Sequence, residues 1–303
     1  PALYCNLKRA NFLHYLPEEL VNYMVHITDL NRERNQQIIE QAKEINELLL
    51  ENNITPIFLK GTGNLLEGLY EDIAERMVGD IDFLVSKEEY KKTIIVLKQN
   101  KYNETQKAKH PFPHTRHYAR INKKNRIAAV EIHDQLIIKK YFKYFGYETT
   151  FKKILIVNKN EAVLSYNDQL CLSIISKHIN DNGYLFKNIS LRNSYDLFLL
   201  SKKTNAIKAI NQLKPLKLIL NQYLAISNDI FGNPKSLNYI KNIQTKNYLK
   251  SFYKQLNRKS KIETKLIKFY LKYKLRLSII KQIVTKKEMR NWFVERNLST
   301  KKD

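Results

Sequence analysis

Residues 79–85 constrain the fold of this chain more than any other segment, because acidic and apolar residues alternate along them. Asp80 and Asp82 are separated by Ile81 and followed by Phe83. Side chains of a β-strand point alternately to opposite faces, so the pattern predicts a strand with a buried apolar face and an acidic face. Two carboxylates roughly 7 Å apart on one strand face need solvent or cations to offset their repulsion. The segment therefore predicts a sheet whose acidic face binds cations.

The residues around this strand predict a mixed sheet within an α/β unit. The expected order is helix, strand, helix, strand, helix and hairpin, with defined limits at 32–53, 54–59, 80–85, 115–121 and 127–133. Ser86 and Glu89 form a capping-box pattern at the start of the helix that follows the acidic strand. Helices and strands that alternate in this way pack as layers around a sheet.

The second half of the chain has a different pattern. Helical spacing of apolar residues predicts helices over 167–180, 184–202, 206–230 and 237–296, with breaks at Pro215, Gly232, Pro234 and 258–261. We therefore predict an α+β protein. Residues 1–159 form an α/β domain with a mixed sheet, and residues 160–303 form an all-α domain.

A third acid follows the same alternation. In residues 127–133, Ala129, Glu131 and His133 share one face of the predicted strand. If this strand is a neighbour of the first, Glu131 joins Asp80 and Asp82 in a triad of acids. Oxygen-rich clusters of this kind suit Mg²⁺, which takes further ligands from phosphate. The triad predicts a site for two Mg²⁺ ions that orient a triphosphate and stabilise the departing pyrophosphate.

The phosphates also need hydrogen-bond donors, and the turn at Lys60, Gly61, Thr62 and Gly63 could supply them. It lies where a strand ends and a helix begins, so backbone N–H groups favour an anion there and glycine permits close approach. The chain has no GxxxxGK[ST] motif, so this is not a Walker A loop. Each motif alone is common in proteins; their order along one chain is the specific signal.

Residues 58–85 resemble the uncharacterised nucleotidyltransferase family of the polymerase-beta-like superfamily. The resemblance rests on the Leu59-Lys60-Gly61 turn, on Arg76, on the strand with Asp80 and Asp82, and on the later Glu131-Ile132-His133. It continues into the second half at Lys177-His178, at Arg192 with Asp196, and in residues 286–297. It covers about residues 35–300 and departs from the superfamily pattern in its Gly-Thr turn and its longer spacing to Asp80.

The resemblance implies the superfamily's minimal α/β fold and a two-metal transfer of a nucleoside monophosphate from an NTP to an acceptor hydroxyl, with release of pyrophosphate. By position, Asp80 and Asp82 would bind both Mg²⁺ ions, and Glu131 would bind the catalytic ion and assist deprotonation of the hydroxyl. Gly61 and Thr62 would occupy the superfamily's Gly-Ser turn. Lys60, Gly61, Thr62 and Arg76 are therefore the predicted nucleotide-binding residues.

Several residues next to these motifs allow two interpretations each. His110, His114, Arg116 and His117 form either a loop of cations that contacts phosphate or acceptor, or a plain surface loop, since Pro111 and Pro113 give no metal-binding geometry. The other candidates for substrate contacts are His133, Lys177, His178 and Arg192. For these, the alternatives are a structural imidazole at His133 and a helix-packing ion pair between Arg192 and Asp196.

Charge and cysteine content bound the partners and the compartment. Cys5 and Cys171 are far apart with no CxxC pair, so we expect no structural zinc and no disulfide framework, and a reducing cytoplasm. The formal net charge is +24, and residues 235–303 carry 20 Lys and Arg against 4 acids, a net +16. Such a basic segment attracts RNA, nucleotides or an anionic membrane surface, or is simply a solvated helical face.

These observations favour a nucleotidyltransferase in the cytoplasm, with a location at the inner face of the membrane as a variant. The acceptor is open: a small molecule, a sugar-containing intermediate, a protein, or RNA. Two alternatives remain, an enzyme of toxin type that adds nucleotides to tRNA, and a non-catalytic RNA- or membrane-binding protein on the same fold. The basic segment at 262–284, with Leu, Ile, Phe and Tyr at helical intervals, is compatible with each of them.

Overall fold

The computed structural model describes residues 1–105, 112, 113 and 115–299. Within them, seven strands form one mixed sheet in the order β3-β4-β5-β2-β1-β7-β6. The strands are β1 Ile57–Phe58, β2 Asp80–Leu84, β3 Asn103–Glu104, β4 Ile121–Asn122, β5 Ala129–His133, β6 Leu155–Val157 and β7 Glu161–Val163. Strands β2 and β5 are parallel, as are β1 and β7, and the other neighbours are antiparallel. The predicted α+β fold with a mixed sheet is confirmed.

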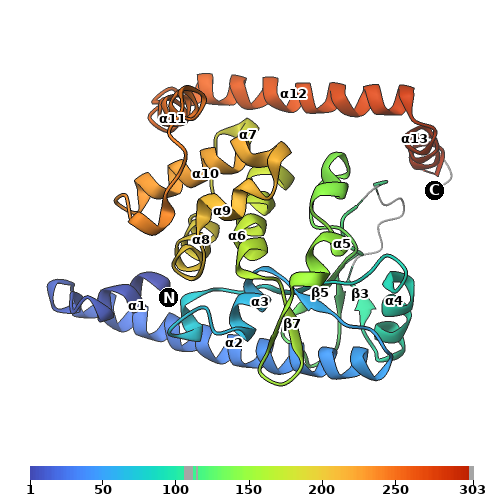
Figure 1. Ribbon diagram of the computed structural model, residues 1–303, viewed down its shortest axis with the longest axis horizontal. Coiled ribbons are helices and arrows are strands. Elements are labelled where there is room, and N and C mark those ends of the chain that lie inside the picture. The colour runs from blue at the N-terminus through green and yellow to red at the C-terminus, as the bar shows by residue number, and fades with distance from the viewer. Residues whose placement is uncertain (106–111, 114, 300–303) are drawn as a thin grey trace.

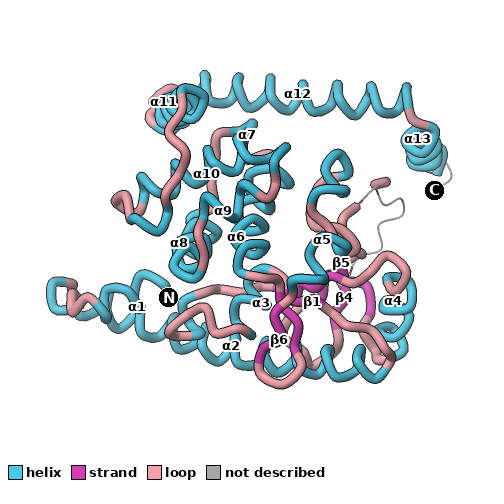
Figure 2. Tube along the Cα trace, viewed as in Figure 1, coloured by secondary structure: helices cyan, strands magenta, loops and turns pink. Residues whose placement is uncertain are grey.

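Helices surround the sheet and then make up the rest of the described chain (Figure 1, Figure 2). Those in the first half are α1 Ala2–Arg9, α2 Glu18–Glu51, α3 Lys60–Leu66, α4 Tyr90–Gln99 and α5 Tyr147–Thr150. Those in the second half are α6 Tyr166–Ile175, α7 Gly183–Phe186, α8 Leu191–Lys203, α9 Ala206–Asn211, α10 Lys217–Ile230, α11 Ile243–Leu256, α12 Lys261–Thr285 and α13 Lys287–Ser299. A π-helical turn, η5 Ser176–Asn180, extends α6. None of the described helices is both long enough and apolar enough to cross a membrane.

Helix α2 runs along the sheet and fixes the starts of the two central strands. Its Ile38, Ala42, Ile45 and Leu49 are fully or almost fully buried in the main core. Gln41 on the same helix forms a reciprocal pair with the backbone of Ala128, 3.0 and 3.1 Å long, just before β5.

Two buried amides of α2 act in the same way on the segment that leads to β2. Asn31 donates to the carbonyl of Ala74 at 2.7 Å, and Asn35 donates to the carbonyl of Arg76 at 2.6 Å. Both amides are buried, so these bonds satisfy polar groups that would otherwise be costly to remove from water. The result is a rigid frame for the strands that carry the acids.

Some elements differ from the predictions. The first helix is longer than expected, since α2 begins at Glu18 rather than at residue 32. The predicted strand over 115–121 is wrong in extent: only β4 and an isolated bridge between His117 and His133 are regular there. The predicted helix over 184–202 is broken, because Lys187 adopts a left-handed backbone conformation with φ of 51° and Ser190 caps a new helix. Strands β6 and β7 were not predicted at all.

Candidate active site

The register of β2 against β5 brings two acids from distant parts of the chain side by side. Asp82 is directly opposite Glu131, and Asp80 is opposite Ala129. Residues at matched positions of neighbouring strands point to the same face. The apolar partners Ile81 and Val130 point to the opposite face and are fully buried. The alternation of acidic and apolar residues therefore places all three carboxylates on one face of the sheet.

Asp82 is the most enclosed of the three acids and is held by two groups. The Nζ atom of Lys60 lies 2.6 Å from its Oδ1, and Nε2 of His133 lies 2.9 Å from the same oxygen. Burial by itself would raise the pKa of Asp82, but the ion pair with Lys60 and the hydrogen bond from His133 outweigh it, and the pKa lies well below its usual range. Asp82 is therefore ionised across the physiological range.

At the two neighbours of Asp82, burial is the dominant influence on the pKa. It lowers the pKa of His133 to about 4 despite the nearby carboxylate, so the imidazole is neutral and donates its Nε2–H to Asp82. Burial raises the pKa of Glu131, and the negative charge of Asp82 adds to the effect. Two carboxylates packed this closely disfavour each other's ionised form, which makes Glu131 the member of the cluster best suited to take up a proton.

A guanidinium bridges the two acids at the mouth of the cluster. Arg120, just before β4, donates from Nε to Glu131 at 3.0 Å and from Nη2 to Asp80. Its side chain is 51% exposed, so it can leave the acids without disturbing the core. A cation thus occupies the space between two carboxylates, and a divalent ion would meet the same attraction there.

The donor set fits a divalent metal. Among the described residues, candidate ligand atoms of Asp82, Glu131 and His133 lie within 4.8 Å of one another. Because Nε2–H of His133 donates to Asp82, the two carboxylates are the groups that supply oxygen ligands. Asp80 adds a carboxylate on the rim, joined to Glu131 through Arg120. Two or three carboxylates with room for phosphate oxygens is the coordination that Mg²⁺ prefers.

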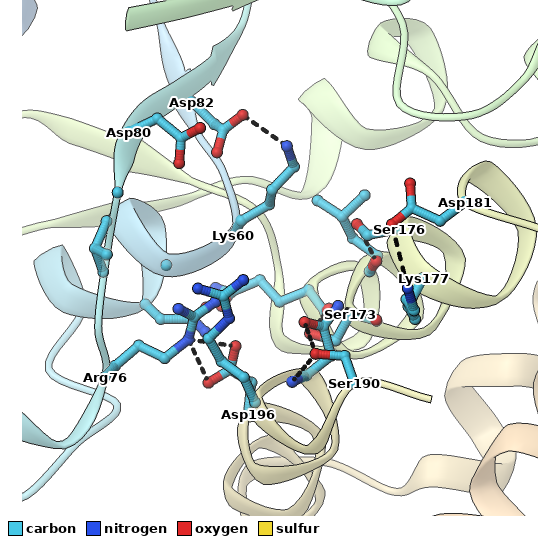
Figure 3. A pocket seen from close by; sticks show the side chains of 18 of the residues that line it. Lys60, Arg76, Asp80, Asp82, Ser173, Ser176, Lys177, Asp181, Ser190 and Asp196 are labelled. Carbon is cyan, nitrogen blue, oxygen red and sulfur yellow. Dashed lines mark hydrogen bonds and ion pairs between the residues drawn. The ribbon is translucent and has the colours of Figure 1, made fainter. Parts of the chain in front are cut away.

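A pocket of about 300 Å³ extends from this cluster into the helical half of the chain. Figure 3 shows Lys60, Asp80 and Asp82 at one end and Ser176, Lys177 and Asp181 at the other. The lining residues from the helical half come from α6, η5, α8 and the segment before α8: Gln169, Leu172, Ser173, Ser176, Lys177, Asp181, Ser190, Arg192, Asn193 and Asp196. The cavity is therefore mainly polar, with cations on several sides.

The sheet half and the helical half are joined at this pocket by a buried ion pair. Nε of Arg76 lies 3.1 and 3.0 Å from the two oxygens of Asp196 on α8. Both side chains are less than 10% exposed. Asp196 also accepts a hydrogen bond from the hydroxyl of Tyr70. The alternative ion pair between Arg192 and Asp196 is not formed among the described residues: Asp196 pairs with Arg76, and Arg192 donates to the carbonyl of Met77.

Comparison with known proteins decides which class of enzyme this site belongs to. Residues 1–232 match the profile of a family described as uncharacterised nucleotidyltransferase. The chain belongs to this family. Family membership makes nucleotidyl transfer the general reaction of the protein, and the matched segment contains every residue of the acid cluster and of the pocket. A search among curated proteins finds no match.

In this nucleotidyltransferase the turn after β1 acts on the acidic strand. Residues 60–63 already belong to α3, and Thr62 is 1% exposed. Its hydroxyl donates to the backbone carbonyl of Asp80 at 3.0 Å, so it holds the start of β2. A Cβ added to Gly63 would lie 2.7 Å from the carbonyl oxygen of Phe58, which explains why only glycine lets α3 approach β1.

Of the remaining residues predicted to contact substrate, some line the pocket and one does not. Lys177 and Arg192 line the pocket. His178 is fully buried among the rings of Tyr184, Tyr223 and Tyr248, whose centroids lie 5.1–5.7 Å away, and it does not line the pocket.

The rings of His117 and His133 lie close together but are tilted rather than stacked, and two other histidines of the predicted loop fall outside the described residues. The rings of His117 and His133 have centroids 5.0 Å apart, and Nδ1 of His117 is 2.8 Å from the carbonyl oxygen of Tyr118. His110 and His114, which were considered for the same loop, lie outside the described residues.

Several residues of the acid cluster and of the pocket in this nucleotidyltransferase were not anticipated. Arg120 was missed because a single arginine before a short strand carries no local signal. Ser173, Ser176 and Ser190 were missed because serines in helices and caps are common, and only the packing of α6 against α8 brings them together. Ser173 near the end of α6 and Ser176 in η5, three positions apart and so on one side of the helix, were the available clue.

Proposed function

We propose that this protein is a Mg²⁺-dependent enzyme that transfers a nucleoside monophosphate from an NTP to a hydroxyl group of an acceptor and releases pyrophosphate. The observation that carries the proposal is the register of β2 and β5, which pairs Asp82 with Glu131 beside Asp80 at the edge of a polar pocket. Carboxylates gathered on one face of a sheet repel one another unless a cation offsets their charge. A bound divalent ion therefore explains why these acids lie together.

Asp80, Asp82 and Glu131 are the proposed metal ligands and hold two Mg²⁺ ions with the triphosphate. When bound, the ions neutralise the phosphate oxygens and stabilise charge on the leaving pyrophosphate. Arg120 moves away from Asp80 and Glu131 as the ligands are taken up, and its exposure permits that motion. Lys60 and His133 act through Asp82: both hold its Oδ1 and keep the carboxylate in one orientation.

Glu131 is the proposed base. Its raised pKa suits a group that accepts the acceptor's hydroxyl proton near neutral pH. The acceptor oxygen bonds to the α-phosphorus as the bond from that phosphorus to the β-phosphate bridging oxygen breaks. The proton goes to a Glu131 carboxylate oxygen, and pyrophosphate leaves with the bonding electrons.

The cations of the pocket are the proposed triphosphate contacts. Arg116 is half-buried, lines the pocket, and makes no ion pair with any residue in the part of the chain that the structure describes. Lys177 is only loosely paired, with its Nζ 3.8 Å from Asp181. Arg192 donates to the carbonyl of Met77 over 3.4 Å. Three weakly engaged cations around one polar cavity suit an anion with several phosphates.

Arg76 and Thr62 have a different proposed role. Arg76 is committed to Asp196 and Thr62 to the backbone of Asp80, so both position the site rather than contact phosphate. Gly61 lines the pocket beside Lys60, and a Cβ there would lie 2.9 Å from Cγ2 of Val78, so glycine lets the start of α3 pack against the segment before β2. The hydroxyl-lined wall formed by Ser173, Ser176 and Ser190 suits an acceptor rich in hydroxyl groups, such as a sugar-containing molecule.

The test is an assay of pyrophosphate release with each of the four NTPs, Mg²⁺ and pools of candidate acceptors. We expect release that requires a divalent ion and is abolished in Glu131→Gln. The matched control is Glu44→Gln, which removes an exposed acid paired with Arg126 and leaves activity unchanged. Nucleotide binding that is independent of metal and identical in wild type and Glu131→Gln would refute the proposal.

A further inference from the structure

Helix α12 has two apolar faces, and only one of them packs on the rest of the chain. Ile267, Leu271, Leu275 and Ile279 recur every fourth residue and are half-buried. With about 3.6 residues per turn, these side chains share one side of the helix, which is the side turned toward α7 and the body. They account for the attachment of α12 to the protein.

The opposite side of α12 carries a second apolar stripe with no partner in the described chain. It spans about 100° of the helix circumference and runs the full length of the helix. Its members include Leu266, Phe269, Tyr273, Leu277, Ile280 and Val284, which are between 44% and 68% exposed. Figure 1 shows α12 as the outermost element of the molecule, between α11 and α13. A continuous apolar stripe on the outermost helix is a surface made for contact.

The stripe is bordered by positive charge on both sides. Lys265, Lys272 and Arg276 lie along one edge, and Lys274 and Lys281 lie along the other. All five are exposed. The helix contains seven basic residues and one acid, and that acid, Glu263, is paired with Arg258 at 3.1 Å. An apolar centre with basic borders complements a surface that is apolar inside and anionic outside.

Two other occupants fit less well. A second copy of α12 would bring basic edges against basic edges, and like charges beside an apolar seam oppose pairing. A single-stranded nucleic acid would use the aromatic rings of Phe269 and Tyr273 for stacking, but it offers nothing to Leu266, Leu277, Ile280 or Val284. Aliphatic side chains are stabilised when they leave water for an apolar medium, which a nucleic acid does not provide.

We infer that α12 docks this protein on the surface of a lipid bilayer that contains anionic headgroups. The helix lies in the plane of the surface, with its outer stripe among the upper acyl chains and its lysines among the headgroups. The inner stripe keeps the body attached to the helix, so docking of α12 holds the whole protein at the bilayer. This inference is independent of the proposed reaction, since it uses none of the pocket residues.

The test is flotation of the full chain with vesicles, one set made of equal parts phosphatidylglycerol and phosphatidylcholine and one of phosphatidylcholine alone. We expect flotation with the anionic vesicles only, and its loss as salt concentration rises. A protein that stays at the bottom of the gradient with anionic vesicles, or that floats equally with both sets, would overturn the inference.

Two variants with the same change in net charge test whether the outer stripe of α12 makes the contact with the vesicles. Phe269→Glu with Leu277→Glu alters two exposed positions of the stripe and changes the net charge by two, and we expect it to weaken vesicle binding by roughly tenfold or more. Lys43→Glu changes the net charge equally on an exposed position of α2, on the other side of the molecule from α12, and retains binding. Equal flotation of both variants would overturn the assignment.

Three controls keep the outcome unambiguous. We expect the circular dichroism spectrum and the thermal midpoint of the double variant to match those of wild type, since both side chains are exposed. Fluorescence anisotropy with single-stranded RNA and light scattering test the other occupants. If the double variant loses RNA binding, or dissociates a dimer, while wild type ignores vesicles, the stripe belongs to that partner and the lipid inference fails.

Discussion

The two ends of the pocket are built in different ways. At the sheet end, Asp82 is buried, paired in register with Glu131, and fixed by hydrogen bonds of 2.6 and 2.9 Å. At the helical end, the cations are loosely held: Lys177 is 3.8 Å from its acid. Arg116 comes from the segment before β4, but its strongest charge interaction is with Asp181 of the helical half, and it has no ion-pair partner among the described residues. A fixed end and an adaptable end share one cavity.

This difference indicates a division of labour. Reactive groups lose efficiency if they must be reoriented during catalysis, so a rigid network at the acids favours the chemical step. Groups that bind a flexible triphosphate gain from being unpaired beforehand, because no existing ion pair has to be broken. We therefore expect substitutions at the sheet end to lower kcat and substitutions at the helical end to raise KM.

The largest effect is expected from Asp82→Asn at the sheet end. Loss of the charge removes the proposed metal ligand, and we expect kcat to fall on the order of 10³-fold with little change in fold. Turnover with Mg²⁺ measures the effect, and Asp29→Asn, an exposed acid paired with Arg32, serves as control. A loss confined to KM would place Asp82 at the binding end instead.

The next effect concerns the ion pair that joins the two ends. Asp196→Asn leaves the buried guanidinium of Arg76 without its charge partner, and such losses cost about 3 kcal/mol. Urea denaturation is the measurement, with Asp181→Asn, an exposed acid near the same pocket, as the matched control. Equal midpoints for the two variants would mean that the pair contributes nothing to stability.

Titration of Glu67, between the sheet half and the helical half, makes the free energy of unfolding depend on pH. Burial raises the pKa of Glu67 to about 7, and Gln169 of α6 donates to its carboxyl group. The folded state therefore favours the neutral acid, so this contribution to stability is present below the unfolded pKa and is lost as pH rises through 7. We expect Glu67→Gln to raise the free energy of unfolding by roughly 2 kcal/mol at pH 8 and by much less at pH 4. A pH-independent difference between variant and wild type would contradict the assignment.

The smallest effect is expected at the helical end. Arg116→Gln removes one cation from several, and we expect KM for the NTP to rise roughly tenfold while kcat stays within about twofold. Steady-state kinetics at saturating Mg²⁺ separates the two constants. Arg126→Gln, at an exposed ion pair outside the pocket, is the control. A fall in kcat with KM unchanged would erase the proposed division between the ends.

The sequence predicted the core of the fold because its signals were periodic and local. The alternation around Ile81 and Val130 defined β2 and β5, and Pro215 broke the helix where α9 ends and α10 begins. The short strands β6 and β7 escaped prediction because three residues carry too little periodicity. The break at Lys187 escaped because nothing in its side chain signals a positive φ.

For the candidate site too, local patterns could be predicted and contacts that depend on packing could not. Acids on strands could be located, since strand geometry dictates which side chains share a face. The partners of those acids could not: whether Lys60 contacts phosphate or Asp82, and whether Arg76 pairs with Asp196, depend on the packing of α3 and α8. The order of the motifs pointed to the correct family, whereas the hydrogen-bond network could be seen only in the folded structure.

We propose above that Asp80, Asp82 and Glu131 share divalent ions with an NTP. A crystal structure with Mg²⁺ and a non-hydrolysable NTP tests it most directly. We expect metal density bounded by oxygens of all three residues and the triphosphate, with Arg120 displaced from the acids. A triphosphate bound elsewhere, or an Arg120 still bridging Asp80 and Glu131 beside bound nucleotide, would contradict the account.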